Sequence, residues 1–154
     1  MDEAGIDNRL YRAYARSLRG VKVYASVSGK KRERVSMIGA LVKDSFIAPM
    51  TFKGACNQDV FNAWLESVLL PELSPGMTIV MDNAAFHKSP QTKSLIQKAG
   101  CFLKFLPSYS PDLNPIEHCW HKLKALLKPL VQKGRKNIQT LLNTALRQIT
   151  KNLN

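Results

Sequence analysis

Two carboxylates in contrasting settings most constrain what this chain can fold into. Asp82 ends an apolar run, residues 78–81, of the kind that forms a buried strand, and polar residues follow it. Glu117 follows the turn-rich loop 108–115 and begins an amphipathic run that reaches about Leu130. One acid is thus displayed at a strand end and the other at a helix start, with 34 residues between them. Such a pair can converge on divalent metal, and paired Mg²⁺ ions are a device for cutting and joining phosphodiesters.

Hydrophobic periodicity predicts the elements around this pair. Alternation predicts three strands, at 21–28, 35–42 and 45–52, the last two joined by a tight turn at 43–44. Helical spacing then predicts a helix from Asn57 to about Leu69. After it we expect, in order, a strand at 78–82, a helix at 90–99, a strand at 101–106 and two helices after 116. Strands first, then alternating strands and helices, predict a mixed α/β sheet. We expect one main domain, residues 1–132, with 133–154 as a C-terminal basic helix packed on it or extending it.

The chain is strongly basic. It has 23 Lys and Arg against 11 Asp and Glu, a formal net charge of +12. The cations gather in two blocks, one between Arg9 and Arg34 that includes Arg32, and one after Glu117 that includes Lys124 and Lys128. A solvated surface is one interpretation, and contacts with a phosphate backbone are the favoured one. Membrane attraction is disfavoured, because we find no bilayer-length apolar run and no signal peptide, and we expect a soluble cytoplasmic protein.

Three cysteines complete the composition that bears on function. Cys56, Cys101 and Cys119 are odd in number and form no Cys-x-x-Cys arrangement. This pattern favours neither a disulfide framework nor a zinc ribbon. We expect reduced, mostly buried thiols.

Three sequence blocks together resemble the catalytic blocks of the DDE transposases, specifically the bacterial insertion-sequence branch of the Tc/mariner superfamily. They are Asp2-Glu3-Ala4-Gly5, the segment 81–89 (MDNAAFHKS), and the segment 106–120 (LPSYSPDLNPIEHCW). The third block is long and specific, and the gap of 34 residues is the one that this branch uses. The similarity runs from Asp2 to about Leu130, which is most of the chain.

The resemblance implies a ribonuclease H-like fold, a mixed sheet flanked by helices, in which Asp2, Asp82 and Glu117 bind two Mg²⁺ or Mn²⁺ ions. It implies metal-dependent cleavage of DNA at the terminal inverted repeats of a transposon, followed by transfer of the 3′ ends into target DNA, usually at a TA dinucleotide. A homodimer is expected when the protein is active, associated with the bacterial nucleoid. Candidate DNA contacts are Arg32, Arg34 and Lys88, with His121, Lys124 and Lys128 on the helical stripe that begins at Glu117.

The site residues also have structural interpretations. Glu117 is well placed as the acid of a helix cap behind Asn114 and Pro115, although the matched block favours metal ligation. His87 makes either a local hydrogen bond that fixes its loop, the favoured reading, or a catalytic contact. Asn83 either forms a turn or makes a hydrogen bond that orients a metal ligand.

For the other candidate residues a structural role is favoured over a functional one. His118 and His121, three positions apart with no third ligand, are weak evidence for zinc. Trp64 and Trp120 lie on apolar stripes and are expected in the core. Asp112, in a Ser-Pro-Asp turn, is expected to close backbone hydrogen bonds.

The beginning of the chain departs from the family pattern. In the family the first aspartate ends a central strand, whereas only Met1 precedes Asp2 here. That strand is therefore expected to be missing or truncated, as is the N-terminal helix-turn-helix region that would recognise transposon ends. The chain is either the downstream half of a transposase split between two reading frames or a truncated remnant. Asp2 would then lie at a fraying terminus, with Asp7 as the fallback ligand.

Two other functions remain open from sequence. A non-catalytic DNA-binding remnant is supported by the basic blocks and by the pair of helices around 133–136, and it would bind DNA equally well with or without Mg²⁺. A ribonuclease H-like nuclease acting on RNA–DNA hybrids would share the chemistry, but the third block favours transposition.

Overall fold

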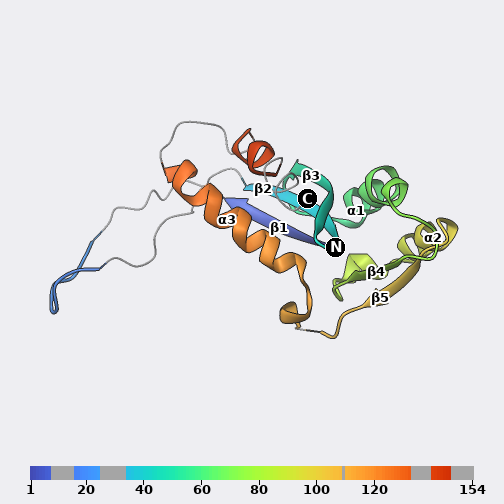
Figure 1. The fold of residues 1–154 in the computed structure, drawn as a ribbon, viewed down its shortest axis with the longest axis horizontal. Coiled ribbons are helices and arrows are strands. Elements are labelled where there is room, and N and C mark those ends of the chain that lie inside the picture. Colours follow the sequence, from blue (N-terminus) through green and yellow to red (C-terminus); the bar gives the residue numbers. More distant parts are fainter. Residues whose placement is uncertain (8–15, 25–33, 109, 133–139, 147–154) are drawn as a thin grey trace.

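Five strands form two separate sheets. A computed structural model of the 154-residue chain describes residues 1–7, 16–24, 34–108, 110–132 and 140–146. Strands β1 (Asp2–Asp7), β2 (Arg34–Val42) and β3 (Ser45–Lys53) form an antiparallel sheet in that order (Figure 1). Strands β4 (Thr78–Met81) and β5 (Phe102–Phe105) form a parallel pair. The predicted mixed α/β architecture is confirmed.

The β2–β3 hairpin matches its prediction. Its turn lies at Lys43 and Asp44, and Lys43 takes a φ of 53°, a conformation found in tight turns. The strand predicted at 21–28 is wrong over 21–24, where the structure has no strand, and residues 25–28 lie outside the described part. Val21 and Val23 are 58% and 52% exposed, so the alternating pattern has no apolar layer to pack against.

The first strand, which the sequence predicts to be missing or truncated, is present as β1. β1 begins at Asp2 and continues after it, pairing with β2 from Asp2 opposite Gly39 to Asp7 opposite Arg34. Asp2 is only 7% exposed, so it does not lie at a fraying terminus. The strand is held by tertiary contacts, because Ile6 is buried in one core and Met1 in the other.

The first helical segment begins where the sequence predicts. Asn57 caps α1 (Gln58–Trp64) by accepting a hydrogen bond from the Val60 backbone N–H at 2.9 Å. The helix continues as a π turn, η1 (Leu65–Leu69), and a 3₁₀ turn, η2 (Leu70–Glu72).

The later helices also follow the sequence signals. Helix α2 (Pro90–Lys98) starts at a Ser89 cap and ends before Gly100, whose φ of 69° suits glycine. The short 3₁₀ helices η3 (Ala85–Lys88) and η4 (Pro111–Leu113) precede α2 and α3 (Ile116–Gln132). Among the described residues, no helix has the length and apolar content needed to cross a membrane.

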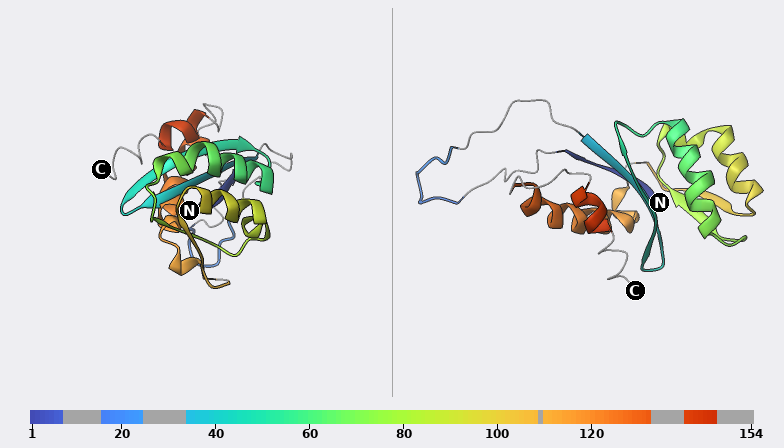
Figure 2. Two further views of the ribbon diagram at one scale, coloured as in Figure 1. Left: turned by 90° about the vertical axis from the view of Figure 1, so that its right-hand side faces the viewer. Right: turned by 90° about the horizontal axis from the view of Figure 1, so that it is seen from above.

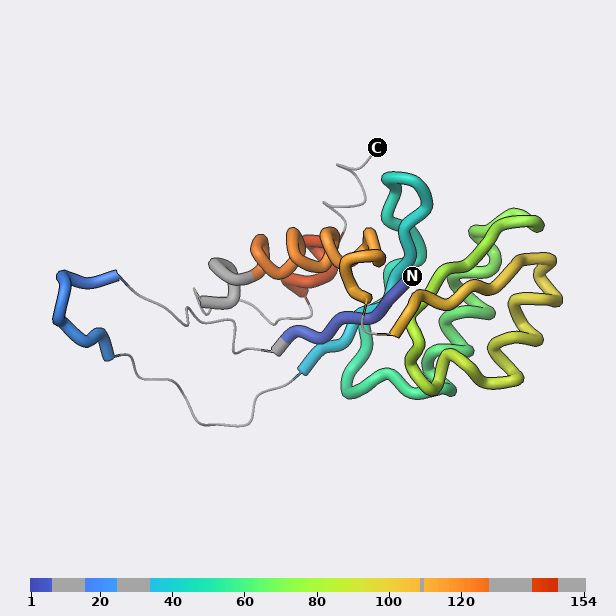
Figure 3. The backbone as a smooth tube through the Cα atoms, turned by 90° about the horizontal axis from the view of Figure 1, so that it is seen from below, coloured from blue at the N-terminus to red at the C-terminus, as the bar shows by residue number. Residues whose placement is uncertain are grey.

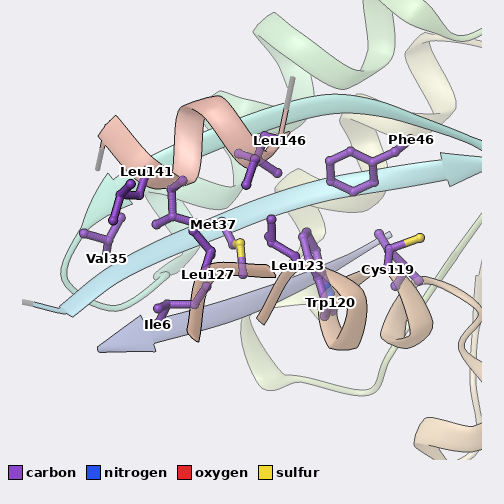
Figure 4. Packing of buried hydrophobic residues seen from close by; sticks show 13 residues of the cluster. Ile6, Val35, Met37, Phe46, Cys119, Trp120, Leu123, Leu127, Leu141 and Leu146 are labelled. Carbon is purple, nitrogen blue, oxygen red and sulfur yellow. The ribbon is translucent and has the colours of Figure 1, made fainter. Parts of the chain in front are cut away.

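Each face of the three-stranded sheet carries its own core. On one face, α3 and a helical stretch at 140–146 cover the sheet (Figures 2 and 4). On the other face lie α1, α2 and the β4–β5 pair. The first core contains Ile6, Val35, Met37, Phe46, Ile116, Cys119, Trp120, Leu123, Leu127, Leu141, Leu142, Ala145 and Leu146. Of the proposed C-terminal segment 133–154, only 140–146 is described, and it packs on this core.

A gap separates the two sheets near the N-terminus (Figure 3). Pairing of β1 with β2 starts at Gly39, whereas β2 continues to Val42 with β3 alone beside it. Across the gap, the Met1 ammonium donates a hydrogen bond to the Val80 carbonyl oxygen at 2.9 Å. An apolar cavity of about 400 Å³ lies there, lined by both sheets and by the start of α3.

The three cysteines are free thiols. Cys101 and Cys119 are buried and Cys56 is half-buried. Burial raises the pKa of Cys119, and burial together with the nearby Glu3 charge raises the pKa of Cys56 to about 12. These thiols are therefore protonated near neutral pH, in keeping with the expectation of reduced structural cysteines.

Candidate active site

Three acids from distant parts of the chain line one pocket. Asp2 is the first residue of β1, Asp82 follows the last residue of β4, and Glu117 lies in the first turn of α3. The pocket has a volume of about 380 Å³, and the loop between β5 and α3 supplies most of its remaining wall. The two settings read from sequence, a strand end and a helix start, are therefore the two that meet here.

Asp2 is oriented by a tryptophan from α3. The Trp120 indole Nε1–H donates a hydrogen bond to Asp2 Oδ2 at 3.2 Å. Trp120 is 1% exposed and meets the edge of Phe46 with ring centroids 5.3 Å apart (Figure 4). The prediction that Trp120 belongs to the core is correct, but its indole also contacts a site acid, which the apolar stripe did not reveal.

The carboxyl of Asp2 resists ionisation. Burial is the largest cause, and the charges of Glu3 and Glu117, with a hydrogen bond to the Glu117 side chain, add to it, although a backbone hydrogen bond at Glu3 acts the other way. Together they raise the pKa of Asp2 from 3.8 to about 7.

Asp82 is anchored by one of its two oxygens. Its Oδ1 accepts a hydrogen bond from the Ala84 backbone N–H at 2.9 Å and lies 2.7 Å from His87 Nδ1. The Asp82 side chain is 48% exposed, so packing alone does not fix it. These two contacts set its orientation at the pocket wall.

His87 joins Asp82 to a second acid. Its other ring nitrogen, Nε2, lies 2.8 Å from Glu3 Oε1, and the ring is fully buried. Burial lowers the pKa of His87, but the hydrogen bonds and charges of Glu3 and Asp82 outweigh it, and the net shift is upward. The favoured sequence reading, a local hydrogen bond from His87 that fixes the loop, agrees with this geometry.

Glu117 is exposed on the first turn of α3. Its backbone N–H donates to the Asn114 carbonyl oxygen at 3.1 Å, which starts the helix. Its side chain lines the same pocket as Asp2 and is among the causes that raise the pKa of Asp2. The residue therefore serves the helix start through its backbone and leaves the carboxyl free for the pocket.

The donor set suits a hard divalent cation. In the part of the chain that the structure describes, no three His, Cys, Asp or Glu side chains lie close enough to form a ready-made metal cage. Mg²⁺ does not require such a cage, because it keeps several waters and binds through one or two carboxylates plus substrate phosphates. A pocket lined by three carboxylates fits that chemistry and offers no thiolate or paired histidines for zinc.

The other predicted site residues are only partly gathered here. Asn83 lines the pocket and donates to the Leu106 carbonyl oxygen at 2.5 Å, tying the ends of β4 and β5 together. Lys88 is exposed on η3, with its Nζ 6.0 Å from the centre of the Phe105 ring. His121 is exposed on α3 and Lys124 is half-buried there.

Of the three other DNA-binding candidates only Arg34 is described with its side chain, and it lies away from the pocket. Arg34 pairs with Asp7 at the far end of β1, and its side chain lies over Gly5, where a Cβ would collide with it. Five strand steps of about 3.3 Å place it roughly 16 Å from Asp2. Asp7, the fallback ligand, is the last residue of β1, at the same far end of the strand, and its side chain lies outside the described part. Arg32 and the side chain of Lys128 lie outside the described residues.

Sequence reasoning missed Glu3 as a site residue. No local pattern points to Glu3; once β1 is known, the strand period gives only its face, because neighbours on a strand point to opposite faces. Asp2 faces α3, so Glu3 faces the side where His87 lies.

Comparisons with known proteins agree on one group. Residues 1–139 match the family described as "DDE superfamily endonuclease". The Tc1 transposase of Caenorhabditis elegans is 34% identical over 70 residues, 46% of this chain and 26% of that protein. The Tcb1 transposase of Caenorhabditis briggsae is 30% identical over 97 residues, 60% of this chain and 36% of that protein.

Two solved structures share the fold. The Mos1 strand transfer complex matches with a TM-score of 0.63 and 14% identity, over 98% of this chain and 51% of the other. The Mos1 mariner paired end complex with Mn matches with a TM-score of 0.62 and 14% identity, over 99% of this chain and 52% of the other. The chain thus spans about half the length of the matched Mos1 chains and about a third or less of the worm transposases.

Proposed function

Because this chain belongs to the DDE superfamily endonucleases, we propose that it is the catalytic domain of a DNA transposase, which cleaves DNA at transposon ends and transfers the 3′ ends into target DNA. The observation that most supports this is the convergence of Asp2, Asp82 and Glu117 on one pocket. Their supports come from a strand, a strand end and a helix start, as the resemblance implies. The 34-residue gap and the block 106–120 support a place in the bacterial insertion-sequence branch.

In this proposal the three carboxylates hold two Mg²⁺ or Mn²⁺ ions. When bound, such ions lower the pKa of an attacking water or 3′-hydroxyl and stabilise the leaving oxygen. The protein's part is to hold the acids in place. Trp120 orients Asp2, His87 and the Ala84 backbone orient Asp82, and Asn83 fixes the adjoining loop.

DNA is the proposed partner. Lys88 and His121 are exposed and Lys124 is half-buried, on η3 and α3, and we infer that these side chains contact phosphates. Homodimer formation, an upstream helix-turn-helix portion and a place at the nucleoid belong to the same proposal, on the strength of the family resemblance.

The test compares acids inside and outside the pocket. Asp82→Asn and Glu117→Gln are expected to abolish Mn²⁺-dependent nicking of a supercoiled plasmid, because each removes a metal-binding charge. Binding of a fluorescent DNA duplex should change little, since phosphate contacts come from cations. Asp112→Asn is the matched control, because Asp112 is an exposed acid on η4 outside the pocket lining.

Nicking that survives Asp82→Asn would contradict the assigned roles, as would loss of duplex binding in step with loss of nicking. A non-catalytic DNA-binding remnant is the second candidate, favoured by the basic blocks and the formal net charge of +12. That candidate predicts duplex binding and a melting temperature that are both indifferent to Mn²⁺.

A further inference from the structure

Three polar side chains form a continuous chain that ends at the pocket. Glu3 Oε1 lies 2.8 Å from His87 Nε2, and His87 Nδ1 lies 2.7 Å from Asp82 Oδ1. We propose that Glu3 is a positioning residue, which acts through the His87 ring to hold Asp82 in the orientation that binds metal. This inference rests on the proposed function, in which Asp82 is a metal ligand.

Glu3 reaches Asp82 through His87. Asp2 and Glu3 are neighbours on β1 and therefore point to opposite faces of the sheet. Asp2 lines the pocket and receives the Trp120 hydrogen bond, whereas Glu3 is absent from the pocket lining. Any influence of the Glu3 carboxylate on the orientation of Asp82 therefore passes through the imidazole.

The His87 ring is held rigidly enough to transmit that influence. It has no exposed surface, and its centroid lies 4.4 Å from the Phe61 ring and 4.4 Å from the Phe86 ring. These aromatic contacts fix the plane of the ring. They do not decide between the two orientations of the ring that are related by a flip about the Cβ–Cγ bond. The Glu3 carboxylate does, because it sets where Nε2 points and so where Nδ1 points.

Asp82 needs such support. Its side chain is 48% exposed and is not confined by packing. Oδ1 already accepts from the Ala84 backbone N–H, and the His87 contact commits the same atom a second time. Oδ2 is thereby left for the pocket. Hydrogen bonds behind a ligating carboxylate orient it toward the metal, and their loss commonly weakens metal binding 10–100-fold.

The charge pattern argues that Glu3 does more than satisfy a buried histidine. A backbone carbonyl would accept the same hydrogen bond without adding charge. Glu3 instead places a further carboxylate beside the pocket acids, next to Asp2 on β1 and one imidazole away from Asp82. Repulsion between these carboxylates is unfavourable in the protein alone and is relieved when cations bind nearby. Glu3 therefore favours the metal-bound state on two grounds, orientation and charge.

The test measures Mn²⁺ affinity by isothermal titration calorimetry, beside melting temperature in EDTA. Glu3→Ala is expected to weaken Mn²⁺ binding about 10–100-fold. Glu3→Asp keeps the charge but withdraws the carboxylate by one methylene group, so it should also weaken binding, and it serves if the alanine variant does not fold. Glu3→Gln keeps an acceptor at the same reach and should recover part of the affinity.

A destabilised control separates positioning from a purely structural role. Thr92 Oγ1 bonds Asn62 Oδ1 at 2.7 Å and Ser89 Oγ at 2.8 Å, in a buried network between α1 and α2 that does not touch the pocket. Thr92→Val is therefore expected to lower the melting temperature and leave the Mn²⁺ affinity unchanged.

Two outcomes would overturn the inference, and they are distinguishable. If Glu3→Asp and any folded Glu3→Ala protein bind Mn²⁺ as tightly as the unmodified chain, Glu3 is only structural and the proposed function stands. If the unmodified chain itself binds no Mn²⁺, the proposed function fails and this inference fails with it.

Discussion

At the scale of single residues, the orientation of Asp2 depends on a glycine, Gly39, which has no side chain. Gly39 lies opposite Asp2 on β2, and a Cβ there would collide with the Phe46 ring. Because Gly39 leaves this space, Phe46 can pack against the edge of Trp120. Trp120 in turn places its indole N–H on Asp2. A glycine on β2 thus helps to aim a carboxylate on β1.

The raised pKa of Asp2 predicts a pH-dependent stability. Because the folded state raises the pKa of Asp2, the protonated Asp2 carboxyl contributes stability to the fold. This contribution is complete below the pKa of the unfolded state, 3.8, and is lost as pH rises through the folded-state pKa of about 7. Asp2→Asn cannot ionise, so it removes this loss of stability at high pH, and its amide oxygen still accepts a hydrogen bond from Trp120. Without metal, it is therefore expected to raise the free energy of unfolding, relative to the unmodified chain, more at about pH 8 than at about pH 5. Urea unfolding in EDTA measures the difference.

Mn²⁺ should reverse the ranking at about pH 8, because a ligand that binds only the folded state stabilises it. The unmodified chain gains this stabilisation, and Asp2→Asn loses it. Asp112→Asn is the control and should show neither effect, since Asp112 is exposed. Equal pH profiles for Asp2→Asn and the unmodified chain would contradict the account of Asp2 burial.

At the scale of elements, the gap between the two sheets has strand edges on both sides. β2 extends past its pairing with β1 over Ala40 to Val42, and the next positions in register before Met1 would lie opposite Leu41 and Val42. β4 presents the Val80 carbonyl toward the gap, and Thr78, two residues earlier, faces the same way. The apolar cavity between these edges has room for an extended segment.

An apolar, β-branched tetrapeptide placed ahead of residue 1 is therefore expected to stabilise the protein. It would pair antiparallel with β2 and parallel with β4, and it would replace the Met1 ammonium, whose pKa burial lowers, with an uncharged amide. Two or three new backbone hydrogen bonds at about 0.5–1.5 kcal/mol each suggest a gain of roughly 2 kcal/mol. Urea unfolding compares the two proteins.

A Gly-Ser tetrapeptide and an apolar tetrapeptide with a central proline are the matched controls. Neither should stabilise the protein, because the first has little to bury and the second lacks a backbone N–H. If all three extensions give the same stability, the gap does not accept a strand.

The elements with local signals were predictable from sequence, and those that depend on distant contacts were not. The β2–β3 hairpin, the capped α1 and α2 and the settings of Asp82 and Glu117 follow from nearby periodicity and turn residues. β1 has little apolar alternation and is a strand only because β2 and the two cores hold it. The contact of Glu3 with His87 joins residues 84 positions apart, which no local pattern reveals.

At the scale of the whole molecule, acids and cations are separated. The formal net charge is +12, yet the pocket gathers three carboxylates. A polyanion would be repelled from the pocket itself and attracted by the basic surface around it. Lys88 lies on η3, which follows Asp82, and Lys124 lies on α3, which contains Glu117. Divalent cations in the pocket would remove the remaining repulsion.

This separation predicts that the placement of cations, and not the total charge alone, sets DNA affinity. Lys88→Ala and Lys124→Ala are each expected to reduce the slope of log K for duplex DNA against log salt by about 0.9, the value for one lost phosphate contact. Fluorescence anisotropy over a salt series measures the slope. Lys98→Ala is the matched control, because it removes the same charge from an exposed position in the last turn of α2. If Lys98→Ala reduces the slope as much as the other two, binding follows net charge, and the surface around the pocket has no special role in holding DNA.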